Sequence, residues 1–202
     1  MPLLVATNNA GKLRELRELL DPLELVAPTD IDLNLEVEEN GHTFAANAEL
    51  KVRAFARAAD LIALADDSGL EVDALNGAPG VYSARFGGPY LDDAGRYHLL
   101  LEQLSDVPSS KRRARFRCCM FAAAPDGRTC MAEGICEGLI AAEPAGDAGF
   151  GYDPIFYLPS YEKTMAQISP DLKNQISHRS AALHAIRPLL LQTFPELQPQ
   201  SI

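Results

Sequence analysis

The chain has 202 residues, of which 47% are hydrophobic, and its 28 acidic and 18 basic side chains give a formal net charge of −10. That length suits one α/β domain or two closely packed lobes with a sizeable core. The acidic balance argues against non-specific binding to nucleic acid or anionic membranes, although a local basic cluster could still bind a small anion. The chain contains no apolar run near the roughly 20 residues of a membrane helix.

The first part of the chain alternates predicted strands and helices. Strands are predicted over 3–6 and 23–27, and a helix over 12–20 follows a polar turn. The clearest helix is predicted over 43–59, where apolar residues recur at helical spacing and Thr43 suits an N-cap. Because this alternation is followed by a hairpin later in the chain, a mixed sheet is expected.

A short apolar run over 61–65 reads as a buried strand. Asp66 and Asp67 follow it, and Gly69 is expected to let the backbone turn there. Carboxylates at the end of a strand suit Mg²⁺, which takes one or two of them together with substrate phosphates. The alternative is that these residues form a solvated turn, because Asp, Ser and Gly are common turn formers.

The second half predicts a helix over 91–104, two long strands over 113–124 and 129–140, and a final helix over 178–194. The strands form a hairpin around a Pro-Asp-Gly turn, and residues 195–202 are expected to be a loose tail. The four cysteines lack metal-site spacing and are expected to be buried, reduced thiols. The fold predicted is α/β with a mixed sheet flanked by helices, and 1–194 form a single domain.

Three segments could contact phosphates. Thr7–Lys12 joins a predicted strand to a helix, where backbone N–H groups and a Lys suit an anion. It is not a Walker A loop, and an ordinary turn is the alternative. Lys51 lies one helical turn after Asn47, with solvent exposure of both as the simpler interpretation. Arg85 could clamp a phosphate, or form a surface ion pair.

Two further segments carry candidate site residues. Glu36, Glu38 and Glu39 precede the long helix; they are a solvated face or supply a metal ligand beside Asp67. The segment Gly149–Pro154 is expected to expose two aromatics, Phe150 and Tyr152, which a plain turn would rarely do, and Phe150 could stack on a base.

A third group lies near the start of the final helix. Lys173, His178 and Arg179 bring cationic donors there. Because cations are unfavourable at a helix N-terminus, their placement suggests an anionic or carbonyl ligand.

Taken together, these segments resemble the inosine triphosphate pyrophosphatase family over residues 4 to about 186. Six motifs occur in the family's order: 6–12 (ATNNAGK), 38–41 (EENG), 65–70 (ADDSGL), 77–85 (GAPGVYSAR), 149–154 (GFGYDP) and 177–179 (SHR). The resemblance implies a two-lobed α/β fold with a long central mixed sheet and a substrate cleft between the lobes. It implies Mg²⁺-dependent hydrolysis of inosine, deoxyinosine and xanthosine triphosphates to the monophosphate and pyrophosphate, by a homodimer.

The resemblance also implies residue roles. Asp67 is the proton acceptor and a metal ligand, and Glu39 or its neighbour Glu38 helps to hold the ion. Substrate-binding residues, with Lys51 and Arg85 added for charge compensation, are Thr7, Asn8, Asn9, Ala10, Gly11, Lys12, Lys51, Ser68, Arg85, Phe150, Gly151, Tyr152, Asp153, Lys173, His178 and Arg179.

Two other functions are possible alternatives for a chain with these motifs. A less selective or Nudix-like nucleotide hydrolase is one, but no helix carries the Glu-rich Nudix pattern. A non-enzymatic nucleotide- or RNA-binding module is the other; it would not need the acidic pair, and the net charge opposes RNA. No targeting signal is visible, so the cytoplasm is the expected location.

Overall fold

The computed structural model describes residues 1–7 and 9–198. The strands are β1 (Leu3–Val5), β2 (Leu25–Val26), β3 (Ala63–Val72), β4 (Arg113–Ala123), β5 (Thr129–Ile140), β6 (Phe156–Leu158) and β7 (Lys163–Thr164). The helices are α1 (Ala10–Leu19), α2 (Phe44–Ala59), α3 (Asp93–Gln103), α4 (Pro170–Ile176) and α5 (His178–Thr193), with short 3-10 helices between them.

The strands form one seven-stranded sheet in the order β2-β1-β3-β4-β5-β6-β7. β1 runs parallel to β2 and β3, whereas β5–β6 and β6–β7 are antiparallel pairs. The mixed α/β sheet predicted from the sequence is therefore confirmed. β6, β7 and α4 were not predicted, because they are only three, two and seven residues long.

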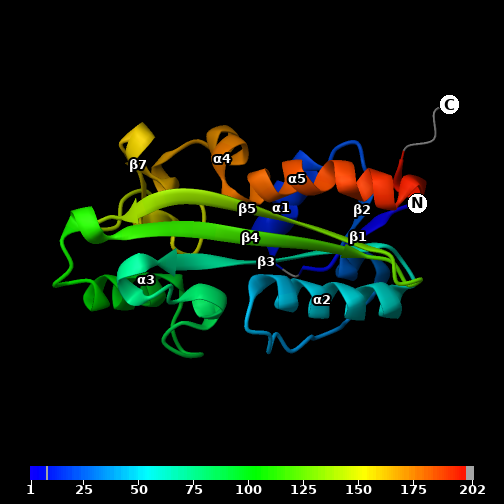
Figure 1. Ribbon diagram of the computed structural model, residues 1–202, viewed down its shortest axis with the longest axis horizontal. Coiled ribbons are helices and arrows are strands. Elements are labelled where there is room, and N and C mark those ends of the chain that lie inside the picture. The colour runs from blue at the N-terminus through cyan, green and yellow to red at the C-terminus, as the bar shows by residue number, and fades with distance from the viewer. Residues whose placement is uncertain (8, 199–202) are drawn as a thin grey trace. The chain divides into compact units, whose positions relative to one another are not determined.

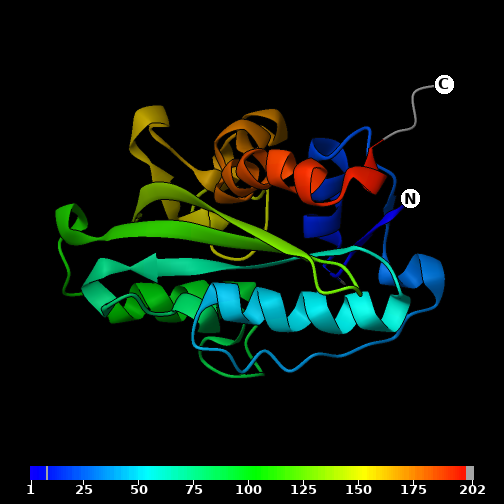
Figure 2. The ribbon, with the colours of Figure 1, turned by 45° about the vertical axis from the view of Figure 1, so that its right-hand side comes forward.

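The chain divides into two compact units. Unit 1 consists of Met1–Asp67, Cys118–Gly134 and the chain from Arg179 onward. Its strands are covered on both faces: α1 and α5 pack on one side, and α2 packs on the other. Figures 1 and 2 show α2 (cyan) and α5 (red) on opposite sides of these strands. Burial on both faces explains why β1 and residues 118–123 of β4 are entirely apolar.

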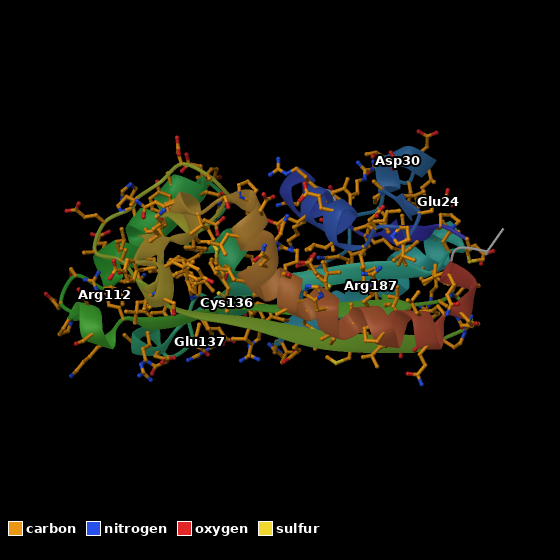
Figure 3. All side chains as sticks on the ribbon, turned by 90° about the horizontal axis from the view of Figure 1, so that it is seen from above. Glu24, Asp30, Arg112, Cys136, Glu137 and Arg187 are labelled. Atoms are coloured by element: carbon orange, nitrogen blue, oxygen red, sulfur yellow. The ribbon has the colours of Figure 1, made fainter. Side chains whose placement is uncertain are left out.

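Unit 2 consists of Ser68–Arg117 and Ile135–His178. Its core joins residues of α3, β4, β5 and β6 with Tyr152 and Met165. Arg112, labelled in Figure 3, closes one end of this unit by donating hydrogen bonds to the carbonyls of Leu104, Val107 and Ala141. The buried guanidinium thereby satisfies its own donors and supplies hydrogen bonds to backbone acceptors.

Local chemistry fixes several element ends as predicted. Thr43 caps α2, its hydroxyl accepting a hydrogen bond from the Ala46 N–H at 3.1 Å. The turn between β4 and β5 is closed by a 3.0 Å bond from the Ala124 N–H to the Arg128 carbonyl. The expectation of a loose tail is wrong for 195–197, because Pro195–Leu197 forms a 3-10 helix beyond α5 and Leu197 is buried against the unit 1 core. Residues 199–202 lie outside the described part of the chain.

The four cysteines are free thiols, and three of them are buried. Within residues 1–7 and 9–198, no helix is long and apolar enough to cross a bilayer.

Candidate active site

β3 does not stop before the acidic pair, which contradicts the predicted turn. The strand runs from Ala63 to Val72, so Asp66 and Asp67 lie inside it, 3% and 7% exposed. Neighbouring strand residues point to opposite faces. Asp66 accordingly meets α1 and α5, whereas Asp67 meets α2. The two carboxylates therefore belong to two different clusters, both within unit 1.

Asp66 is the centre of a buried ion network. Its carboxylate lies 2.8 Å from the Lys12 ammonium and 3.4 Å from the Arg179 guanidinium. Arg179, 1% exposed, also binds Glu15 on α1. Burial alone would raise the pKa of Asp66, but the cationic neighbours outweigh it and hold the pKa well below its usual range. Asp66 is therefore ionised at neutral pH and anchors the Lys12 side chain.

The predicted phosphate loop lies between β1 and α1. Asn9 caps α1, its side chain accepting a hydrogen bond from the Lys12 N–H at 3.0 Å. Thr7 accepts one from the Asn9 N–H at 3.2 Å. Asn8 lies outside the described residues. A capped helix start with a lysine in its first turn provides the donors that an anion needs.

Asp67 faces the second cluster, on α2. Asn47 donates a hydrogen bond to it at 3.0 Å, and Lys51 lies 2.5 Å from Glu39 and 3.2 Å from the Asp66 carbonyl oxygen. Burial raises the pKa of Asp67, and the negative charge of Glu39 adds to the shift. Burial lowers the pKa of Lys51, but the negative charges of Glu39, Asp66 and Asp67 together outweigh it and the net shift is upward.

This donor set fits Mg²⁺. Asp67 and Glu39 repel each other, which a cation would relieve, and both offer the hard oxygen ligands that Mg²⁺ prefers. Glu38 is exposed, whereas Glu39 is partly buried and paired with Lys51. Among the described residues, no group of three or more acidic, His or Cys side chains has metal-binding geometry. A cation here would take its other ligands from water and substrate phosphates.

The Gly149–Pro154 motif forms a compact turn in unit 2. The Asp153 carboxylate accepts a hydrogen bond from the Phe150 N–H at 2.9 Å and pairs with Lys173 at 2.7 Å. The Lys173 ammonium also lies 4.6 Å from the centre of the Phe150 ring. Gly149 has φ +81°, and a Cβ there would lie 2.1 Å from Asp153.

Two aromatics of this motif have different surroundings. Phe150 is partly exposed, but Tyr152 is only 5% exposed and donates to the Ser83 carbonyl at 2.9 Å. The expectation that the motif exposes both aromatics is therefore wrong, because Tyr152 belongs to the core of unit 2. Gly151 donates its N–H to Asp93 at 2.8 Å.

The remaining candidates in unit 2 are His178, Ser68 and Arg85. His178, 7% exposed, stacks on Phe116 with ring centres 4.8 Å apart. Ser68 follows Asp67 in β3 and is partly exposed. Arg85 is exposed and lies 5.0 Å from the centre of the Tyr82 ring.

Comparison with known proteins identifies relatives of this chain. The sequence model of the Ham1 family matches residues 3–189. The chain belongs to the Ham1 family. It is 52% identical to a dITP/XTP pyrophosphatase of Desulforamulus reducens, over 94% of this chain and 96% of that protein. It is 44% identical to the dITP/XTP pyrophosphatase of Bacillus subtilis, over 93% and 96%. A HAM1 protein from Coxiella burnetii has a similar structure, with a TM-score of 0.87, 42% identity and coverage of 95% and 99%.

In this Ham1-family chain, sequence reasoning missed three side chains that support the clusters. Asn47 was interpreted as solvent-exposed, but its exposed fraction is 0%, because it points at β3. Glu15 contacts Arg179 and Phe116 contacts His178, but neither residue lies in a local sequence pattern that predicts such a contact. A signal existed for Asn47: it follows the buried stripe position Phe44 by three residues, on the face that packs against the sheet.

Proposed function

We propose that this chain hydrolyses non-standard purine nucleoside triphosphates, namely dITP, ITP, XTP and dXTP, to the monophosphate and pyrophosphate. The relatives named dITP/XTP pyrophosphatase match it over nearly its full length. Removal of such nucleotides clears the precursor pool of bases that pair wrongly. A less selective nucleotide hydrolase is the alternative.

The clusters of unit 1 suit the phosphate chemistry. Water attacks the α-phosphorus, Asp67 takes its proton, and pyrophosphate leaves. The raised pKa of Asp67 makes it a stronger base than an ordinary Asp. Lys12 and Lys51, with Arg85 of unit 2, would offset negative charge on the phosphates. We propose that Thr7–Lys12 bind the triphosphate through backbone N–H groups and Lys12.

A divalent cation completes this proposal. Asp67 and Glu39 would hold Mg²⁺, with Glu38 as the weaker candidate because it is exposed. When bound, the ion supplies polarisation of the phosphate oxygens and acidification of the attacking water.

The unit 2 residues suit recognition of the nucleoside. Phe150 offers a partly exposed ring for stacking, and Ser68, Gly151, Tyr152, Asp153, Lys173 and His178 complete the proposed contact set. A 6-oxo purine accepts hydrogen bonds from donors such as Lys173 and His178, whereas the 6-amino group of adenine would leave donors facing a donor. Guanine shares the 6-oxo group, so its 2-amino group must be rejected by shape or by a missing acceptor.

For Arg179 we propose a positioning role in place of the direct substrate contact that the resemblance implies. Its guanidinium is buried and engaged with Glu15 and Asp66. We propose that it fixes the Asp66–Lys12 pair and so aims the lysine at the phosphates. We also propose a homodimer and a cytoplasmic site of action, where the nucleotide pool is located.

The observation that carries the proposal is the pair of acidic residues Asp67 and Glu39 beside Lys51 on α2. The test is pyrophosphate release from dITP, dATP and dGTP with Mg²⁺. Asp67→Asn should lower kcat by roughly 10²–10⁴-fold, the usual contribution of a general base. Glu36→Gln, on the exposed part of the acidic segment, is the matched control and should match wild type. Equal turnover of all three nucleotides would refute base selection. Selective turnover that survives Asp67→Asn would assign the proton to another group.

A further inference from the structure

Asn47 connects two segments that each carry a proposed metal ligand. Its side-chain N–H donates to the Asp67 carboxylate at 3.0 Å, and its side-chain oxygen accepts from the Gly41 N–H at 2.8 Å. Gly41 lies two residues after Glu39. A single fully buried amide thus joins β3 to the segment that leads into α2.

The orientation of this amide is fixed by its partners. A backbone N–H can only donate, so the Asn47 oxygen must face Gly41 and its NH₂ group must face Asp67. An ionised carboxylate is an acceptor, so the pair is matched when Asp67 is charged. Asn47 therefore fixes the position of the Asp67 carboxylate relative to the Gly41 backbone.

The glycine at position 41 allows this approach. A Cβ there would lie 2.7 Å from the Asn47 side-chain oxygen and 2.9 Å from the Ala46 Cβ. Any side chain would push the segment away from α2 or displace the amide. The Gly41–Asn47 contact is thus a close fit between the acidic segment and the helix.

The position of Asn47 within α2 does not explain its presence. Thr43 already caps the helix, and Asn is a poor helix former in an interior position. Both polar ends of the Asn47 side chain bond outside the helix. Lys51, one turn later, repeats the pattern by pairing with Glu39 and with the Asp66 carbonyl.

We propose that Asn47 is a positioning residue: it fixes Asp67 and the Glu39 segment relative to each other, so that the cation site is formed before metal and nucleotide bind. The proposal rests on the function proposed above, in which Asp67 and Glu39 hold the ion. Residues that orient metal ligands typically change metal affinity or activity by about 10–100-fold when removed. Such residues act by reducing the reorganisation that binding would otherwise require.

The test uses two substitutions that break the contact from opposite sides. Asn47→Leu removes both hydrogen bonds while keeping the branched arrangement of heavy atoms, and Gly41→Ala displaces the amide without adding a polar group. Val52→Ala is the matched control. Val52 is also fully buried on α2, but its apolar side chain cannot hydrogen-bond to Asp67 or Gly41. It reports what loosened packing of α2 does by itself.

Three measurements are made on the full chain. Amide exchange of Gly41 is followed without metal, Mn²⁺ binding is titrated without nucleotide, and turnover of dITP is measured against Mg²⁺ and against nucleotide. Both variants should exchange the Gly41 amide faster, and their half-saturating metal concentration should rise by about 10-fold or more. The KM for dITP at saturating Mg²⁺ should stay within about twofold of wild type, because Asn47 is not proposed to contact the nucleotide.

Two outcomes would overturn the proposal. One is a metal dependence in both variants that matches Val52→Ala, which would reduce Asn47 to a packing role. The other is faster Gly41 exchange with unchanged Mn²⁺ binding. Failure of the proposed function is a separate result: wild type would then release no pyrophosphate from dITP, while Gly41 exchange and Mn²⁺ binding would still decide the role of Asn47.

Discussion

Removal of the Arg179 guanidinium should strongly destabilise unit 1. Arg179 is 1% exposed and lies 3.4 Å from Asp66, while its other side binds Glu15. Arg179→Met keeps much of the side-chain volume but removes the guanidinium from two buried carboxylates, those of Glu15 (8% exposed) and Asp66 (3% exposed). Asp66 then keeps Lys12 as a cationic neighbour. Removing one partner of a buried ion pair costs about 3–5 kcal/mol, because the remaining charge stays desolvated.

The chain offers an exposed counterpart for comparison. Arg53 pairs with Glu49 one turn away on α2, with side chains 35% and 42% exposed. Arg53→Met should lower the free energy of unfolding by only about 0.3–0.5 kcal/mol, since solvent screens such pairs. For a protein of this size each kcal/mol shifts Tm by about 2–4 °C, so Arg179→Met should lower Tm by about 6–20 °C.

The assay is urea unfolding followed by circular dichroism at pH 7, repeated at lower pH. The cationic neighbours hold the pKa of Asp66 in the folded chain well below the ordinary aspartate value, so the stabilisation is fully present above that ordinary value and is lost as pH falls below it. In the variant, protonation of Glu15 and Asp66 removes the free-energy cost of burying their charges without the guanidinium. The stability difference from wild type should therefore shrink below about pH 4.

Two results would refute this reasoning. A loss below about 1 kcal/mol at pH 7, close to that of Arg53→Met, would mean that water screens the Arg179 network as it does a surface pair. A large loss that stays constant down to acid pH would mean that the guanidinium contributes by packing rather than by charge.

Two further substitutions test the site. Glu39→Gln should raise the Mg²⁺ concentration for half-maximal turnover by about 10-fold or more. Glu38→Gln is the control and should change that concentration little. If Glu38→Gln had the larger effect instead, Glu38 would be the metal ligand. Gly149→Ala should raise the KM for dITP, because its Cβ would lie 2.1 Å from the Asp153 carboxylate. Gly127→Ala shares a positive φ (+97°) but has open space around it, so it should cost about 1 kcal/mol of stability through backbone strain and leave KM unchanged.

The long periodic elements were predictable because local pattern and tertiary packing agree in them. α2 begins and ends as expected, since its apolar stripe and the Thr43 cap specify the same helix. The β4–β5 pair was equally clear, because a Pro-Asp-Gly turn separates two long apolar runs. In both cases the local signals are confirmed by the structure.

The course of β3 was not predictable from local preference. Asp and Gly are depleted in strands, so 66–69 reads as a turn. The strand continues because each carboxylate finds a partner on a distant segment: Lys12 and Arg179 for Asp66, Asn47 for Asp67. Sequence spacing does not reveal such partners, and it likewise left Glu38 and Glu39 undecided.

The different surroundings of Asp66 and Asp67 follow from the geometry of the strand. Because neighbouring residues of a strand face opposite sides, Asp66 pairs with the cations Lys12 and Arg179. Asp67 instead accepts a hydrogen bond from the Asn47 amide and is subject to the negative charge of Glu39. The pKa of Asp66 is consequently lowered and that of Asp67 is raised. Opposite shifts in a pair of acids indicate separate roles. A permanently charged Asp66 can orient Lys12, while Asp67, the more basic of the two, is suited to accept a proton. A turn at this position would let both side chains reach solvent, and the difference between their pKa values would be lost.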